Sequence, residues 1–211
     1  MLAFLLSTVA ISLSGVMAPG PITAATLAAG ARSRHAGALV ALGHAVIEMP
    51  LILLLSAGIG SFLESSTARA GIGLAGGAVL LVMGVQLLLS VRNPTADQEV
   101  SVQRHPLVIG VVLTAANPYF LVWWATVGLA LATRAMTFGA PMLGLFAIVH
   151  WLCDLGWLEV LSVAGFKGSE AFGSRVQTVV SAVCGLVLLG FGAKFLYDAG
   201  EGILAVMAVV T

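Results

Sequence analysis

The stretch ALVALGHAVIEMPLILLLS, residues 38–56, decides the fold class. It is long enough to cross the hydrocarbon core of a bilayer, which takes about 20 apolar residues, and its ionisable side chains are His44 and Glu48. An ionised side chain at that depth costs about 2.5–3.5 kcal/mol on insertion scales, so such residues usually mark a route for ions, protons or a polar solute. Residues four apart share one face of a helix, so His44 and Glu48 point the same way.

A second stretch, GLFAIVHWLCDLGWLEVLS at residues 144–162, repeats this pattern. It aligns with the first without a gap, and His150 then takes the place of His44 and Asp154 that of Glu48. A pseudo-twofold axis between two such helices would bring their His–acid faces near each other. The alignment therefore indicates an internal duplication that places ionisable groups in both halves of the chain.

The composition is that of an integral membrane protein. The 211 residues are 60% hydrophobic and 9% charged, whereas a soluble domain carries about 25% charged residues. The formal net charge is zero, which gives no indication of nucleic-acid binding. Cys153 and Cys184 lie in different apolar segments without CxxC spacing, which favours buried thiols over a redox or metal site.

Six apolar segments of membrane-spanning length follow one another. The first has no basic residue before it, since the first one in the chain is Arg32, so we interpret it as a retained span rather than a signal peptide. The segments are Leu2–Ala29, Ala36–Ile59, Ala70–Val91, Leu107–Ala132, Ala140–Phe166 and Arg175–Tyr197. The pattern predicts an all-α polytopic membrane protein with six transmembrane helices.

Two further matches extend the internal repeat. Gly77–Leu88 aligns with Gly185–Leu196, and Ala18–Pro21 aligns with Ala115–Pro118. Segments one to three thus correspond to segments four to six. A unit of three crossings has odd parity, so its copy enters the bilayer upside down, as in the inverted repeats of many secondary transporters.

We expect a single transmembrane domain over residues 1–211. It comprises repeat one at 1–91, a linker at 92–105, repeat two at 106–199 and a short apolar tail at 200–211. Glycines such as Gly73 and Gly77, spaced as GxxxG, favour close helix packing, and the small residues of segments three and six could also support a homodimer.

Prolines interrupt the first and fourth segments. Pro19-Gly20-Pro21 and Asn117-Pro118 should each break a helix, because proline lacks a backbone donor and clashes with the preceding turn. Free backbone groups at membrane depth are tolerated inside protein or along a wet cavity, and the half-helix after each break carries a partial positive charge at its N-terminus. We therefore expect these five residues to bind the substrate, for example through its carboxylate.

Trp123 and Trp124 follow the second break. Tryptophan is enriched at membrane–water interfaces, which favours an interfacial position for the pair. The alternative is that they line a substrate cavity.

The two His–acid pairs admit three interpretations. His44, Glu48, His150 and Asp154 could form a proton relay, since histidine titrates near neutral pH. Two imidazoles and two carboxylates could instead bind a divalent metal ion, or each acid could merely satisfy its own histidine. Glu159 lies on another face of its helix and is expected to pair locally or to extend towards the interface.

The basic residues are distributed unevenly among the loops. Those after segments one, three and five contain Arg32, Arg34, Arg92, Arg104, Lys167 and Arg175. The other side contains Arg69, Arg134 and Lys194. By the positive-inside rule the first set faces the cytoplasm, which places both termini outside.

Several of these features resemble the LysE/RhtB family of six-helix exporters, which includes the lysine exporter and the homoserine/threonine efflux proteins. The resemblance rests on Pro19-Gly20-Pro21, on the glycine-spaced segment at 37–43 with Glu48 five residues later, and on Asn117-Pro118. It implies export of amino acids or similar small solutes, driven by the proton motive force or the membrane potential. Relatives in the wider superfamily export divalent cations.

The sequence thus predicts a proton-coupled exporter in the inner membrane of a cell, with the lipid bilayer, a small solute and protons as partners and no cofactor. His44, Glu48, His150 and Asp154 would couple transport to protons, and a divalent metal exporter that uses the same residues is the alternative. An enzyme is not expected: the intramembrane metalloprotease motif HExxH is absent, because Glu48 does not directly follow His44.

Overall fold

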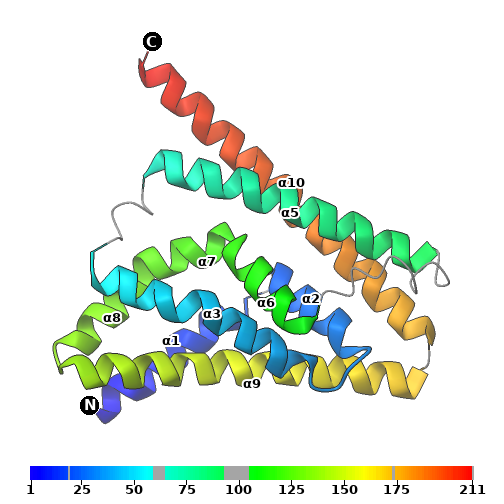
Figure 1. Cartoon of the computed structure of the whole chain (residues 1–211), viewed down its shortest axis with the longest axis horizontal. Coiled ribbons are helices and arrows are strands. Elements are labelled where there is room, and N and C mark those ends of the chain that lie inside the picture. The colour runs from blue at the N-terminus through cyan, green and yellow to red at the C-terminus, as the bar shows by residue number, and fades with distance from the viewer. Residues whose placement is uncertain (19, 59–64, 93–104, 173, 211) are drawn as a thin grey trace.

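The computed structural model describes residues 1–18, 20–58, 65–92, 105–172 and 174–210, and every regular element in these ranges is a helix. The elements are α1 (Leu2–Val16), α2 (Pro21–Gly30), α3 (Ala36–Ser56), α5 (Ser66–Arg92), α6 (Pro106–Ala115), α7 (Pro118–Trp123), the π-helical turn η2 (Trp124–Gly128), α8 (Leu129–Met136), α9 (Ala140–Phe172) and α10 (Ser174–Val210). The predicted all-α class is confirmed. In Figure 1, α3 and α9 lie side by side and α5 crosses α10 on the opposite side of the molecule.

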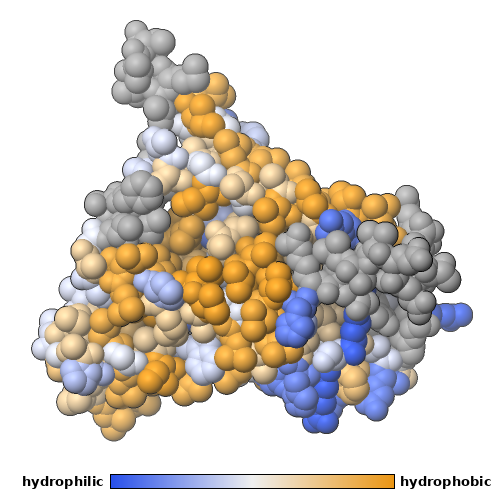
Figure 2. All heavy atoms as spheres, viewed as in Figure 1, coloured by the Kyte–Doolittle hydropathy of each residue, from blue (hydrophilic) through white to orange (hydrophobic). Residues whose placement is uncertain are grey.

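The number of possible membrane spans agrees with the sequence pattern. Five helical stretches are long and apolar enough to cross a bilayer, and the number is six if α1 and α2, which meet at an angle of 80°, are counted as one bent span. Figure 2 shows apolar side chains over most of the visible face, as expected for a lipid-facing surface. A polytopic membrane fold follows.

Both predicted interruptions are present. Pro21 and Pro118 each occupy the first turn of a new helix, where a missing backbone donor costs nothing. Asn117 caps α7, because its side-chain oxygen accepts a hydrogen bond from the backbone N–H of Tyr119 at 3.1 Å. Pro19 lies outside the described residues.

Two segments extend beyond their predicted ends. α9 continues to Phe172 and α10 to Val210, so residues 200–210 are helical and continue the last helix. Polar residues ended the predicted segments, but they do not interrupt backbone hydrogen bonding once a helix leaves the apolar region.

Glycines bring α5 and α10 into close contact. A Cβ atom added at Gly77 would lie 2.9 Å from the carbonyl oxygen of Gly192, and one added at Gly84 would lie 2.9 Å from that of Gly185. In the repeat alignment Gly77 corresponds to Gly185 and Gly84 to Gly192. The Gly77–Gly192 contact therefore has the Gly185–Gly84 contact as its counterpart in the other repeat. These glycine faces are therefore occupied within the chain itself.

A second glycine contact joins α3 to α6. Added Cβ atoms at Gly43 and Gly110 would collide with the backbone of the other helix, at Leu107 and Val40 respectively. The backbones can approach this closely because neither position carries a side chain. The contact fixes the register between α3 and α6, and with it the position of His44 relative to Thr114.

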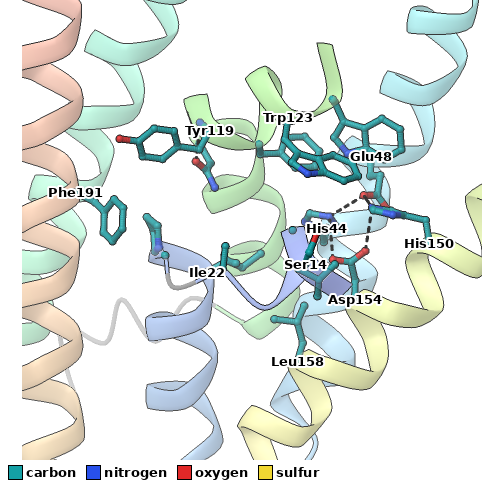
Figure 3. A pocket seen from close by; sticks show the side chains of 18 residues that line it. Ser14, Ile22, His44, Glu48, Tyr119, Trp123, His150, Asp154, Leu158 and Phe191 are labelled. Atoms are coloured by element: carbon teal, nitrogen blue, oxygen red, sulfur yellow. Dashed lines mark hydrogen bonds and ion pairs between the residues drawn. The ribbon is translucent and has the colours of Figure 1, made fainter. Parts of the chain in front are cut away.

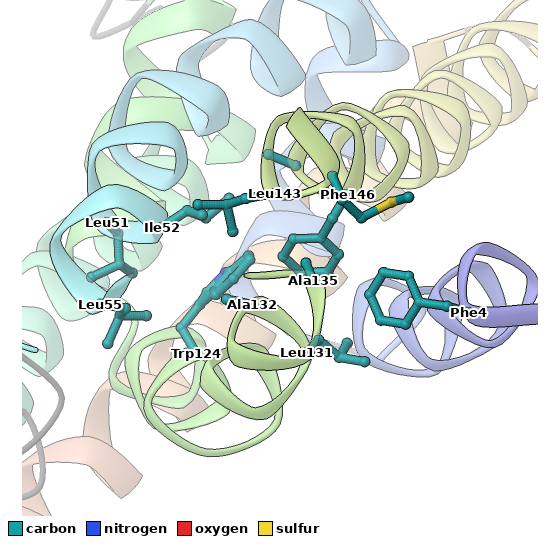
Figure 4. Close-up of a cluster of buried hydrophobic side chains, with 12 residues drawn as sticks. Phe4, Leu51, Ile52, Leu55, Trp124, Leu131, Ala132, Ala135, Leu143 and Phe146 are labelled. Carbon is teal, nitrogen blue, oxygen red and sulfur yellow. The ribbon is translucent and has the colours of Figure 1, made fainter. Parts of the chain in front are cut away.

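Apolar packing surrounds this arrangement at one end of the bundle. Phe4, Leu55, Trp124, Leu131 and Phe146 belong to a buried cluster formed by α1, α3, η2, α8 and α9 (Figure 4). Trp124 and Phe146 are fully buried, with ring centroids 6.1 Å apart. The cluster anchors the helices that carry the ionisable residues.

Candidate functional site

The four ionisable residues that the sequence singled out meet in one place. His44 and Glu48 come from α3, and His150 and Asp154 come from α9 (Figure 3). All four are buried. We call this group the His–acid cluster.

Glu48 lies at the centre of the His–acid cluster. Its Oε1 atom is 3.0 Å from Nε2 of His44 and 3.2 Å from Nε2 of His150. The Glu48 side chain is 0% exposed. One carboxylate oxygen thus faces both imidazoles, one from its own helix and one from the other half of the chain.

Each imidazole has a hydroxyl group at its other nitrogen. Nδ1 of His44 lies 2.8 Å from Oγ1 of Thr114 on α6, and Nδ1 of His150 lies 2.7 Å from Oγ of Ser12 on α1. A hydroxyl can donate to a neutral imidazole and accept from a charged one. Both histidines therefore keep a hydrogen-bond partner in either protonation state.

Ser12 and Thr114 were not among the site residues predicted from the sequence. Both lie in the half-helix before a break, and both are buried. The available signal was a hydroxyl residue in the apolar half-helix that precedes each proline break. This signal does not say which hydroxyl contacts which histidine.

Asp154 is placed differently from Glu48. Its Oδ1 atom is 3.8 Å from Nε2 of His44, and its Oδ2 atom is 3.6 Å from Nε2 of His150. Both distances exceed a normal hydrogen bond. Oδ2 of Asp154 and Oε2 of Glu48 are buried and have no hydrogen-bond partner among the described residues. Such oxygens need a proton or a cation, because an unpaired buried charge is costly.

Aromatic rings enclose the histidines. Trp123 stacks on His150 with ring centroids 5.2 Å apart, and the edge of Phe120 faces His44 at 5.0 Å. The interfacial interpretation is wrong for Trp124, which is fully buried against His150. Both tryptophans line the cavity described next.

A cavity of about 370 Å³ connects the His–acid cluster with both helix breaks. Gly20 and Pro21 line it at the first break, and Asn117 lines it at the second. Pro118 begins α7 and is not among the lining residues. Figure 3 shows Tyr119 and Phe191 at the side of the cavity away from the cluster.

The start of α2 offers backbone donors at the cavity wall. Ile22, in the first turn of α2, lines the cavity. The first N–H groups of a helix have no intrahelical acceptor and carry a partial positive charge. This end of α2 therefore suits an anionic group.

Three side chains of the His–acid cluster have the geometry of possible metal ligands. One ligand atom each from His44, Glu48 and Asp154 lies within 4.8 Å of the others. The two cysteines, Cys153 and Cys184, are free thiols on different helices. Among the described residues, neither thiol belongs to this donor set.

Glu159 pairs locally, as expected. Its Oε1 atom is 2.5 Å from Nδ1 of His35, and its Oε2 atom accepts a hydrogen bond from the backbone N–H of Ala38 at 3.0 Å. Glu159 on α9 thereby caps the N-terminus of α3. It holds together the two helices that form the cluster.

Comparison with known proteins adds one match. The family model described as LysE type translocator matches residues 13–199. No curated protein and no solved structure matches the chain.

Proposed function

The chain belongs to the LysE type translocator family, and from this premise we propose that it exports an amino acid or a similar small solute in exchange for protons. The family is one of membrane transporters, which agrees with the five or six apolar spans. The amino-acid cargo and the coupling to protons are the parts that need a test.

One observation carries the proposal: a cavity reaches from two helix breaks to a buried cluster of two histidines and two carboxylates. Transporter sites commonly lie where broken helices meet near the membrane midplane. A volume of about 370 Å³ can hold a compact amino acid, since small-molecule sites start at about 300 Å³.

The chemistry of the His–acid cluster suits proton exchange. Two carboxylates and two imidazoles can hold different numbers of protons, and histidine changes charge near neutral pH. Both Nδ1 atoms have hydroxyl partners that serve either state. The proposed exchange therefore leaves neither imidazole without a partner.

The substrate carboxylate is assigned to the first turn of α2, next to Gly20 and Pro21. Helix N-termini bind anions through free backbone N–H groups. Asn117 contributes indirectly, since its side-chain oxygen caps α7.

The proposal also includes an inverted repeat and an orientation. The repeat alignment turns the Gly77–Gly192 contact into the Gly185–Gly84 contact, and this correspondence supports a pseudo-twofold axis between α5 and α10. The exposed residues Arg32, Arg34, Lys167 and Arg175 would face the cytoplasm, in the inner membrane, by the positive-inside rule.

Exchange in proteoliposomes tests the function. Vesicles that contain the purified protein are loaded with each of the common amino acids, and uptake of the same labelled amino acid is followed with and without a pH gradient. We expect uptake of at least one labelled amino acid, at a rate that changes when the pH gradient is applied. Glu48→Gln together with Asp154→Asn should abolish that response, whereas Glu170→Gln, an exposed carboxylate on α9, should leave it intact. Unchanged proton-coupled flux in the double variant would show that the coupling role is wrong.

Metal binding by the same purified protein tests the alternative function, export of a divalent cation. Ligand atoms of His44, Glu48 and Asp154 are close enough to share an ion, but the family match does not support this cargo. Stoichiometric binding of Zn²⁺ or Mn²⁺ that is lost in His44→Ala, without exchange of any amino acid, would favour the metal exporter.

A further inference from the structure

We propose that the two carboxylates of the His–acid cluster have different tasks: Asp154 receives the primary ammonium group of an amino acid with an apolar side chain, and Glu48 holds the exchanged proton. The inference rests on the proposed function and deepens it. It names a docking group for the substrate and narrows the substrate class.

Accessibility separates the two acids. The side chain of Asp154 is 8% exposed and that of His44 is also 8% exposed, whereas Glu48 is 0% exposed. Both acids line the cavity, and Asp154 has the more exposed side chain of the two. Figure 3 shows Asp154 above Leu158 on the cavity side of α9.

Hydrogen bonding also distinguishes Asp154 from Glu48. Both Nε2 atoms lie within 3.2 Å of Oε1 of Glu48, while their distances to Asp154 are 3.6 and 3.8 Å. The imidazoles thus contact Oε1 of Glu48, whereas both oxygens of Asp154 lie beyond hydrogen-bond distance of them. Oδ2 of Asp154 has no hydrogen-bond partner among the described residues. A primary ammonium group brings three donors and one positive charge, which is what such a carboxylate lacks.

The rest of the cavity wall determines which side chain the substrate can carry. Beyond the His–acid cluster, the wall near Asp154 includes the apolar and aromatic side chains of Ile22, Phe120 and Leu158. Ser14 also lies there (Figure 3), and its hydroxyl donates to the backbone carbonyl of Ile11. In the part of the chain that the structure describes, no lysine or arginine lines the cavity. A second charge on the substrate side chain would be desolvated there without a partner, so an apolar side chain fits and a charged one does not.

The charges balance during exchange. Before binding, Glu48 holds the proton and Asp154 is ionised. When the ammonium ion pairs with Asp154, the Glu48 proton leaves the protein, so the net charge of the cluster with its bound ammonium group equals that of the cluster before binding. His44 lies between the acids, with Nε2 3.0 Å from Oε1 of Glu48 and 3.8 Å from Oδ1 of Asp154. It can therefore accept the proton from Glu48 as that proton leaves, since His44 also lines the cavity.

Calorimetry on the purified full-length protein tests the assignment with three matched probes. L-leucine carries both charges, 3-methylbutylamine lacks the carboxylate, and 4-methylpentanoate lacks the ammonium group. The wild type should bind leucine and the amine and bind 4-methylpentanoate much more weakly. Asp154→Asn should weaken leucine and amine binding about tenfold or more, the loss expected for one charge-assisted hydrogen bond. Asp154→Glu should recover part of it.

Proton release on binding distinguishes the two acids. It is read from the dependence of the binding heat on the ionisation enthalpy of the buffer. Glu48→Gln should abolish proton release while weakening leucine binding less than Asp154→Asn does. Glu170→Gln on α9 is the matched control and should change neither quantity.

The outcomes separate this inference from the proposed function. Unchanged amine binding in Asp154→Asn, or tight binding of 4-methylpentanoate, would overturn the docking role even if amino acids are exchanged in vesicles. A wild type that binds neither leucine nor the amine would overturn the apolar amino acid class. Binding as expected without exchange in vesicles would refute the transport function and leave the site assignment standing.

Discussion

Nε2 of His150 on α9 lies 3.2 Å from Oε1 of Glu48 on α3, so one carboxylate oxygen of the first half of the chain contacts an imidazole of the second half. The corresponding distance for His44 is 3.0 Å, within one helix. The cross-helix distance depends on how α1 and α9 hold the ring of His150, and this dependence can be tested through the other nitrogen of the ring.

Removal of the Ser12 hydroxyl should disturb His150 selectively. Ser12→Ala leaves Nδ1 of a buried imidazole without its partner at 2.7 Å, which costs about 1–3 kcal/mol. We expect a lower thermal midpoint of the purified protein and a displaced pH profile of exchange. Ser7→Ala is the control on the same helix, since its hydroxyl donates to the carbonyl of Phe4 and lies away from the cluster. Equal effects of both variants would contradict the assigned role of Ser12.

Gly110 should be indispensable for the contact between α3 and α6. In Gly110→Ala the new methyl group collides with the backbone at Val40 and Gly43, and overpacking of this kind costs about 1–3 kcal/mol. Gly144→Ala on α9 meets no atom within 4 Å and gains the same helix propensity. Thermal unfolding in detergent should therefore show a loss for Gly110→Ala and none for Gly144→Ala. A stable Gly110→Ala variant would contradict the close approach.

A bulky residue at Gly20 should block the cavity without unfolding the protein. An added Cβ at Gly20 has only Ala18 nearby, at 4.0 Å, and the backbone there is extended, with φ at −166°, which any residue adopts. Gly20→Trp should thus fold with a thermal midpoint close to that of the wild type and lose solute exchange. Gly190→Trp, in open space on α10, controls for the added indole. Full exchange by a folded Gly20→Trp variant would show that solute takes another route.

Glu159 should stabilise the protein as a cap. Glu159→Ala removes the acceptor of the Ala38 N–H at the start of α3, and the loss of such a cap costs about 0.5–2 kcal/mol. A fall in the thermal midpoint is expected, with little change in substrate affinity. Glu170→Ala, near the exposed end of the same helix, should have a smaller effect. If the two variants unfold at the same temperature, the cap contributes nothing measurable.

The sequence predicted the features that depend on local chemistry. Apolar length predicted the spans, and Pro21 and Pro118 predicted where helices begin anew. The four-residue spacing predicted that His44 and Glu48 share a face, and the duplication predicted that His150 and Asp154 would lie beside them. These inferences needed only one helix at a time, or a symmetry between two.

The hydroxyl partners and the inequality of the two acids could not be predicted. Thr114 meets His44 because Gly43 and Gly110 set the register between two helices, and this register follows from packing rather than from a motif. The alignment treats Glu48 and Asp154 as equivalent. The additional methylene group of glutamate carries its carboxylate between the two imidazoles, which the shorter aspartate does not reach.

Among the described side chains, α10 contributes Phe191 to the wall of the cavity and α5 contributes none. The cluster and its hydroxyl partners belong to α1, α3, α6 and α9. A displacement of the glycine-packed α5–α10 pair would therefore change the width of the cavity without stretching a single hydrogen bond at Glu48. The side of the cavity formed by α10 is thus separate from the hydrogen bonds of the residues proposed to hold the proton, so a change in cavity width need not alter the contacts of Glu48.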